Sequence, residues 1–175
     1  MKCLAANRNA FQPIQKFFLI VAVLCLTTSK SNAQGEVEIA IPEAYELSNI
    51  ILALTEYGKA DQWEDNKNST YYNEVIKFFE PVKDHPILKK VNYSRDLWKD
   101  YLSFRTDAVA YKFNSSNKLI RINNFYTNNG FKPFDSSLSL INDFIQQSKF
   151  RQFYSSHKSY YSSIVQQYDS YYMIK

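Results

Sequence analysis

The strongest helical pattern of apolar residues lies in the segment 42–58, which reads PEAYELSNIILALTEYG. Its large apolar side chains recur every three or four residues and therefore share one helix face: Leu47, Ile50, Ile51, Leu54 and Tyr57. Proline is favoured in the first helical turn and glycine just beyond the last, so Pro42 and Gly58 predict the two ends. Burial of each large aliphatic side chain contributes about 1.5–3 kcal/mol. We therefore expect one helix here, around which the other elements pack.

A second helix is predicted directly after Asn68 or Ser69, because either side chain can cap a helix N-terminus. Its apolar face consists of Tyr72, Val75, Ile76 and Phe79. Pro81 ends this helix, since the residue before a proline disfavours the helical conformation. The sequence DHP at 84–86 then indicates one further helical turn with the proline in its first position. His85 is accordingly expected to be a capping or surface residue.

Three more helical patterns follow. Ser94 can cap a long helix whose buried side is expected to contain Leu97, Tyr101, Phe104 and Ala108, widened by Trp98 and Leu102. The next helix is capped by Asp135 or Ser136, carries Leu138, Ile141, Phe144 and Ile145, and continues after a break with Phe150, Phe153 and Tyr154. The last pattern consists of Tyr161, Ile164, Val165, Tyr168 and Tyr172.

Two regions show strand patterns instead. Apolar residues alternate with polar or small ones in the segment 36–41 (EVEIAI), as in a half-buried strand. The segments 109–113 and 119–123 flank NSSN and predict a β-hairpin on a four-residue loop, although the preceding helix can also run through Tyr111. Together the patterns predict an α+β, predominantly α-helical fold. In it, helices pack around the segment from Pro42 to Gly58, with a short N-terminal strand and a small hairpin.

The N-terminus has the pattern of a secretory signal peptide. Three basic residues and no acidic one precede an uncharged apolar run over 17–26, and small residues follow up to Ala33. We predict a signal peptide over 1–33, with cleavage between Ala33 and Gln34. Cys25 does not indicate a lipid anchor, because it lies inside the apolar run and follows large residues.

The predicted signal peptide implies a secreted or periplasmic protein. The apolar run of ten residues is far shorter than the roughly 20 needed to cross a bilayer, so we expect no membrane span after processing. The segment 34–175 is long enough for one ordinary domain and contains no linker-like stretch or repeat. We therefore predict a single mostly helical domain over 34–175.

Removal of the signal peptide changes the composition. Both cysteines lie within it, at positions 3 and 25, so the mature chain has no disulfide, no thiol nucleophile and no cysteine–metal site. Four of the 21 basic residues are also lost, whereas all 17 acidic residues remain. The mature chain is then neutral, and its charge gives no indication of nucleic-acid binding.

The remaining charges are unevenly distributed. The segment 34–107 has 14 acidic and nine basic residues, whereas 108–175 has three acidic and eight basic ones. Net charges of opposite sign favour docking of the two halves into one domain. The alternative is a basic face in the second half that contacts an acidic partner.

Several kinds of site are excluded by the residues available. With three glycines in the chain, neither a dinucleotide-binding nor a P-loop motif can be written. His85 and His157 are far apart in sequence and do not form the i, i+4 pair of a zinc-binding helix. The neighbouring acids Glu43 and Glu46, or Glu64 and Asp65, are expected to form a solvated face rather than a catalytic pair. We therefore predict no catalytic, cofactor-binding or metal-binding residue in this chain.

Tyrosines are concentrated near the C-terminus: Tyr154, Tyr160, Tyr161, Tyr168, Tyr171 and Tyr172. Their apolar rings and polar tips are suited to stacking on a peptide or glycan ligand. At helical spacing, such tyrosines more often pack in the core or at its rim. An exposed patch would indicate a binding or interaction module of the bacterial envelope, and packing on the segment 47–54 would argue against it.

Several segments together resemble an uncharacterised family of secreted proteins from Gram-negative bacteria: PEAYELSNIILALTEYG, NKNSTYYNEVIKFFEPVKDHP, YLSFRTDAVAYKF, INDF and KSYY with YDSYY. Similar proteins are longer and look like zincin metallopeptidases, with a His/Glu zinc motif beyond the position of Lys175. The resemblance implies that this chain is the N-terminal, catalytically incomplete portion of such a protein. Zinc would then bind only with ligands from a downstream segment.

The chain departs from the family pattern because it contains no HExxH motif, so no ligand or catalytic residue is carried over. Its last helical pattern has no glycine cap, proline or polar tail before Lys175. This pattern is typical both of a truncated product and of a C-terminal helix that ends at the edge of its domain.

Overall fold

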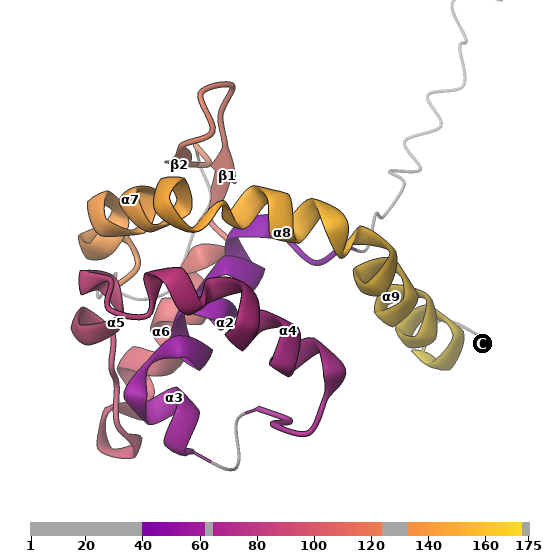
Figure 1. Ribbon diagram of the computed structural model, residues 1–175. Helices are drawn as coiled ribbons and strands as arrows, with labels where there is room; N and C mark the ends of the chain where they lie inside the picture. Colours follow the sequence, from indigo (N-terminus) through magenta and orange to yellow (C-terminus); the bar gives the residue numbers. More distant parts are fainter. Residues whose placement is uncertain (1–39, 62–64, 124–132, 173–175) are drawn as a thin grey trace, which may run out of the picture. The chain divides into compact units, whose positions relative to one another are not determined.

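A computed structural model describes residues 40–61, 65–123 and 133–172 (Figure 1). The chain divides into two units, Met1–Glu38 and Ile39–Lys175, and every described residue belongs to the second. The helices are α2 (Glu43–Leu54), α3 (Glu56–Ala60), α4 (Thr70–Phe79), α5 (Pro86–Lys90), α6 (Trp98–Ala108), α7 (Leu138–Ser148), α8 (Phe150–Ser156) and α9 (Lys158–Tyr172). Three 3-10 turns are η1 (Glu80–Val82), η2 (Arg95–Leu97) and η3 (Asp135–Ser137), and the strands are β1 (Tyr111–Phe113) and β2 (Leu119–Arg121).

The predicted mainly helical fold with a small hairpin is confirmed. The signal peptide over 1–33 and its cleavage between Ala33 and Gln34 lie outside the described residues and stay predictions. The strand over 36–41 is described only at Ala40 and Ile41, neither of which is in a strand.

Helix α2 lies at the centre of the core, as the apolar spacing predicts. Leu47 and Ile51 are fully buried, and the helix contacts α3, α4, α5, α6 and β1. Pro42 has an extended backbone and precedes the helix as its N-cap, where its carbonyl accepts the Glu46 N–H at 3.0 Å. The segment that begins after Pro42 therefore organises the domain.

The prediction of one helix from Pro42 to Gly58 is wrong at its C-terminal end. The chain leaves the helix at Thr55, whose backbone is extended, and re-enters one as α3. The Thr55 hydroxyl donates to the Leu52 carbonyl at 2.7 Å and accepts the Gly58 N–H at 2.9 Å. This side chain thus hydrogen-bonds to a backbone carbonyl at the end of α2 and to a backbone N–H at the start of α3, so it stabilises the break.

Gly58 has a different role from the predicted helix terminator. A Cβ built at this position lies 2.0 Å from the Leu52 carbonyl oxygen, closer than any two such atoms can approach. Gly58 therefore allows α3 to fold back closely onto the last turn of α2.

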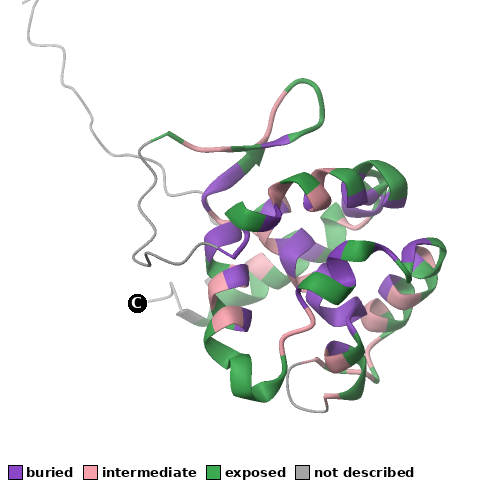
Figure 2. Cartoon of the chain, turned by 90° about the vertical axis from the view of Figure 1, so that its left-hand side faces the viewer, coloured by how far each residue is buried: buried purple, intermediate pink, exposed green. Residues whose placement is uncertain are grey.

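Buried residues (purple) occur along most of the helices in Figure 2. Phenylalanine dominates the rest of this core, and its fully buried members are Phe79, Phe104, Phe134, Phe144, Phe150 and Phe153. Ring centroids of Phe79 lie 5.1 Å from Phe153 and 5.9 Å from Phe144, which joins α4 to α7 and α8. The oppositely charged segments 34–107 and 108–175 thus contribute residues to one core. Arg151 also pairs with Glu43 at 3.2 Å across these segments.

The hairpin is antiparallel, with Phe113 opposite Leu119. Five residues, rather than the predicted four, connect the strands. The Asn114 side chain accepts the N–H groups of Ser116 and Lys118, and Asn117 adopts a left-handed backbone with φ of 56°. Asparagine tolerates this conformation better than most residues, which favours the turn at this point.

Two predicted caps are present in the structure. Ser69 accepts the Tyr72 N–H at 3.1 Å at the start of α4, and His85 accepts the Ile87 N–H on Nδ1 at 3.2 Å at the start of α5. His85 is not a surface residue, however, because it is only 5% exposed. Its Nε2 lies 3.1 Å from Asp143 on α7, so this side chain joins two helices.

The predicted buried face of α6 is partly wrong. Tyr101, Phe104 and Ala108 are buried, mainly against α2. Leu97, Trp98 and Leu102 are instead 46%, 55% and 43% exposed. Ser94 precedes η2 rather than α6 and makes no capping hydrogen bond with its side chain. Of these exposed residues, Trp98 and Leu102 lie one turn apart on α6 and share a second face of the helix.

Candidate functional site

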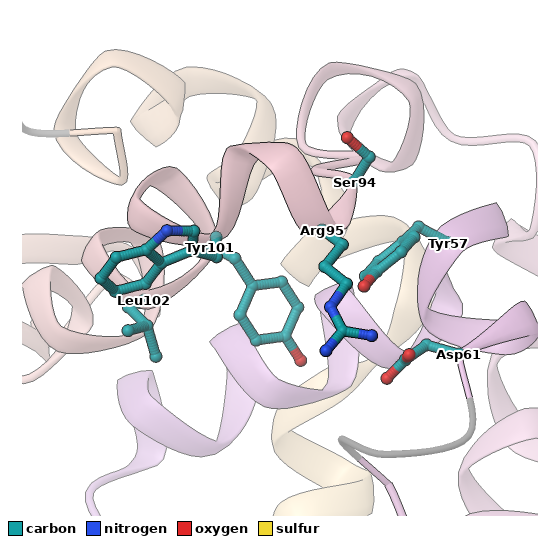
Figure 3. A pocket seen from close by; sticks show the side chains of 7 residues that line it. Tyr57, Asp61, Ser94, Arg95, Tyr101 and Leu102 are labelled. Carbon is teal, nitrogen blue, oxygen red and sulfur yellow. The ribbon is translucent and has the colours of Figure 1, made fainter.

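A cleft of about 310 Å³ lies between α3 on one side and η2 with α6 on the other (Figure 3). Its lining residues are Tyr57, Asp61, Ser94, Arg95, Trp98, Tyr101 and Leu102. This volume is at the lower end of the range of small-molecule sites in proteins. The cleft therefore has room for one small ligand or for the end of a larger one.

Helix α3 supplies the first wall, and local hydrogen bonds fix its position. The Asn92 side chain accepts the Tyr57 N–H at 2.8 Å, which ties the start of α3 to the loop before η2. Asp61 follows the last residue of α3, and its N–H donates to the Tyr57 carbonyl at 2.8 Å. The close approach at Gly58 brings this short helix onto α2. Tyr57 and Asp61 are thus held by backbone contacts rather than by their own side chains alone.

The second wall is one face of the segment 94–102. Arg95, Trp98 and Leu102 follow one another at spacings of three and four and therefore lie on the same side of η2 and α6. Tyr101 lies beside them with only 8% of its surface exposed, and the Arg105 guanidinium is 5.7 Å from its ring centroid. The buried ring anchors this wall to the core.

The two ends of the cleft differ in chemistry. Figure 3 shows the Arg95 side chain extending between the rings of Tyr101 and Tyr57, toward the side on which Asp61 lies. Leu102 lies at the opposite end of the cleft. The cleft thus has a polar end, which carries Arg95 and Asp61, and an apolar end, with aromatic rings between them.

Arg95 is exposed, and within the described part of the chain its guanidinium forms neither an ion pair nor a hydrogen bond. A guanidinium is always charged at physiological pH and binds carboxylates through paired hydrogen bonds. Arg95 is therefore available to an anionic group that enters the cleft.

A second polar cluster surrounds Glu46, which is only 7% exposed on α2. Its Oε1 accepts a hydrogen bond of 2.5 Å from the Tyr71 hydroxyl, and the Tyr161 hydroxyl lies 2.8 Å from that of Tyr71. Burial raises the pKa of the Glu46 carboxyl above its ordinary value, although the hydrogen bond from Tyr71 opposes this effect. A cavity of about 130 Å³ adjoins the cluster. The cluster links α2, α4 and α9.

The acids singled out in the sequence have separate partners where the structure describes them. Glu43 pairs with Arg151, and Asp65 lies 3.4 Å from Lys67, whereas Glu64 is outside the described residues. The expectation of a solvated face is wrong for Glu46, because its neighbours on α4 and α9 cover it. The sequence spacing could not show this cover, since Tyr71 and Tyr161 are distant along the chain.

The two histidines have separate carboxylate neighbours. His85 lies beside Asp143, and His157 Nε2 is 2.8 Å from Glu74. Among the residues that the structure describes, no group of three or more histidine, cysteine or acidic side chains could hold a metal ion.

The C-terminal tyrosines divide between the core and the surface. Tyr154 and Tyr161 are 9% and 5% exposed, and their rings stack at 4.8 Å. Tyr160, Tyr168 and Tyr171 are 41%, 52% and 81% exposed. The Tyr172 side chain is not among those described. The tyrosines therefore form neither a single surface patch nor a purely internal cluster.

The cleft residues were not predicted as a site. The helical spacing predicts Trp98 and Leu102 on the buried side of their helix and gives no prominence to Arg95. One signal was present: the apolar residues from 97 to 108 cover more than one helix face, which is wider than a single buried contact requires.

Within the residues described, no helix combines the length and apolar character needed to cross a lipid bilayer. No family model, curated protein or solved structure matches this chain.

Proposed function

We propose that this domain is a binding module that takes a small ligand, or the end of a larger one, into the cleft between α3 and α6. The observation that carries the proposal is a cavity of about 310 Å³ lined by three aromatic side chains and by one guanidinium that has no ion pair among the described residues. Ligand sites are typically lined by apolar and aromatic side chains, with a few polar groups that fix orientation.

The exposure of the apolar wall supports the same function. Trp98 and Leu102 leave 55% and 43% of their surface in contact with water. A ligand that covered these side chains would gain about 25 cal/mol for each Å² of apolar surface removed from water. An aromatic ring stacked on Trp98 would add about 0.5–1.5 kcal/mol.

The test is a titration of the isotope-labelled full chain with three probes at millimolar concentration, followed by amide chemical shifts. The probes are N-acetylphenylalanine, its neutral amide and N-acetylglucosamine. We expect at least one probe to shift amides of α3 and of the segment 94–102. Trp98→Ala should abolish these shifts, and Tyr171→Ala, which removes an exposed ring on α9, should leave them unchanged. Shifts confined to α9, or none with any probe, would exclude the cleft as the binding site.

We propose, as a second candidate, that the domain is the non-catalytic N-terminal portion of a zincin-like metallopeptidase of the secreted bacterial family that its sequence resembles. The exposed side chains of Ile164, Tyr168 and Tyr171 on α9 support this candidate, because a following domain would have apolar surface to cover. The cleft would then contribute to peptide recognition beside a zinc site in the downstream segment.

The DNA that follows the Lys175 codon tests this second candidate. An in-frame coding region with an HExxH motif would support it. A stop codon with no such coding region downstream would contradict it.

A further inference from the structure

We infer that the ligand of this cleft is the C-terminal residue of a peptide, with its carboxylate on Arg95 and a large apolar side chain toward Leu102. The inference rests on the proposed function and adds the chemical class of the ligand. It depends on the positions of the charged and apolar groups along the cleft and on the size of the cavity.

Arg95 indicates an anionic group on the ligand. Its guanidinium extends into the cleft between two tyrosine rings and has no ion pair among the described residues, although Asp61 lines the same cavity. A neutral ligand would displace water from the Arg95 guanidinium without supplying a negative charge in its place. A carboxylate accepts two parallel N–H groups from one guanidinium, which gives both affinity and a fixed orientation.

The opposite end of the cleft indicates an apolar group. Leu102 lies there, and Trp98 is one helical turn before it on α6. A hydrocarbon or aromatic side chain can cover both without leaving polar atoms unpaired. A sugar ring would place several hydroxyl groups at this end, where each needs a hydrogen-bond partner.

The volume limits how much of a peptide can enter. A cavity of about 310 Å³ holds one amino-acid residue but not an extended segment. Within one residue of a peptide, only the C-terminal residue carries both a carboxylate and an apolar side chain. The Ser94 and Tyr57 hydroxyls, which also line the cleft, are available to the last amide group.

A matched pair of peptides tests the inference on the full chain. The probes are acetyl-Ala-Ala-Phe as the free acid and as the C-terminal amide, together with glucuronic acid as a second source of carboxylate. We expect the free acid to bind at least roughly tenfold more tightly than the amide, since hydrogen bonds to charged groups are the stronger ones. Dissociation constants follow from the shifts of the α3 and α6 amides.

Arg95→Gln should remove most of the difference between acid and amide while leaving the amide's affinity unchanged. Lys112→Gln, which removes one exposed positive charge on β1, is the matched control and should keep the full difference. Arg95→Lys keeps the charge but loses the paired hydrogen bonds, so we expect an intermediate preference. Thermal unfolding of each variant shows that the fold is retained.

The outcomes separate the inference from the proposed function. Equal binding of acid and amide would overturn the inference but leave a functional cleft. Binding of glucuronic acid without either peptide would also overturn it, because the carboxylate would then come from a sugar. If no probe shifts the cleft amides, both the inference and the proposed function fail.

Discussion

The carboxylate of Glu46 and the hydroxyl of Tyr71 form a hydrogen bond of 2.5 Å between α2 and α4. Tyr71 is also 2.8 Å from the Tyr161 hydroxyl, and its ring stacks on that of Tyr160 at 4.7 Å. One tyrosine therefore connects a buried charge in the central helix to the last helix of the domain. Because an ionised carboxylate is costly to bury, this contact contributes to the dependence of stability on pH.

The first prediction concerns that pH dependence. Burial raises the pKa of Glu46 above its ordinary value of 4.5, so the folded protein keeps this proton at pH values where the unfolded chain has lost it. The free energy of unfolding should therefore fall as the pH rises from about 4.5 through the folded-state pKa. Glutamine does not titrate but can still accept from Tyr71, so Glu46→Gln should flatten this part of the profile.

Urea denaturation between pH 4 and pH 8 measures the effect. Glu80→Gln provides a contrast, because a hydrogen bond from Lys83 lowers the pKa of Glu80. Glu80 therefore affects stability in the opposite direction. It stabilises the fold above its ordinary pKa, and this stabilisation is lost as the pH falls. If Glu46→Gln left the profile of the wild-type protein unchanged, Glu46 would not be buried as described.

The second prediction compares the two hydroxyl groups on this network. Among the described residues, Tyr71→Phe leaves the Glu46 carboxylate with one weak hydrogen bond, from Asn49 at 3.5 Å, and should cost about 1–3 kcal/mol of unfolding free energy. Tyr161→Phe removes a bond between two neutral groups and should cost about 0.5–1.5 kcal/mol. The double variant should cost less than the sum, since both changes remove the same Tyr71–Tyr161 bond.

Denaturant unfolding of the three variants at pH 7 gives these values, and Tyr160→Phe is the matched control because it keeps the stacked ring. A larger loss of unfolding free energy for Tyr161→Phe than for Tyr71→Phe would contradict the assignment of Tyr71 as the residue that bonds the Glu46 carboxylate.

Short-range sequence features, namely capping residues and apolar spacing, were sufficient to predict where most helices lie. Ser69 caps α4 and His85 caps α5 because each satisfies N–H groups within three residues, which is a short-range relationship that the sequence shows directly. The break at Thr55 was missed because its hydroxyl competes with the helical backbone, whereas the apolar spacing continues through it.

The site depends on long-range relationships, which explains why it was not predicted. Helical spacing shows that Trp98 and Leu102 share a face, but not whether another element covers that face. In the same way, Glu46 and Glu43 appear equivalent in sequence, yet Tyr71 covers one of them from 25 residues away. Whether each of these residues is buried depends on its packing partners, and the periodicity of the sequence does not identify them.

The third prediction tests the signal peptide. Export of the full chain through the bacterial secretory pathway should yield a mature protein that begins at Gln34, because signal peptidases select small residues before the cleaved bond. N-terminal sequencing or intact mass of the exported protein shows the cleavage position. Ala33→Arg should block processing, whereas Gln34→Ser should allow it. A mature protein that still begins at Met1 would contradict the predicted signal peptide.

The fourth prediction concerns Gly58, where stability and the cleft are connected. An alanine Cβ would lie 2.0 Å from the Leu52 carbonyl oxygen and 3.0 Å from the Thr55 hydroxyl, so α3 must move away from α2. Overpacking of this kind costs about 1–3 kcal/mol, which exceeds the gain of up to about 1 kcal/mol from the higher helix propensity of alanine. Gly58→Ala should therefore lower the free energy of unfolding.

The same displacement should weaken binding in the cleft, because Tyr57 and Asp61 lie at the two ends of α3 and move with it. Ala60→Gly is the matched control: it lowers the helix propensity of α3 by about 0.5–1 kcal/mol without a clash. We expect Ala60→Gly to retain the affinity for acetyl-Ala-Ala-Phe and Gly58→Ala to lose most of it, as measured by the shifts of the α6 amides. Equal affinity in both variants would mean that the position of α3 on α2 does not set the width of the cleft.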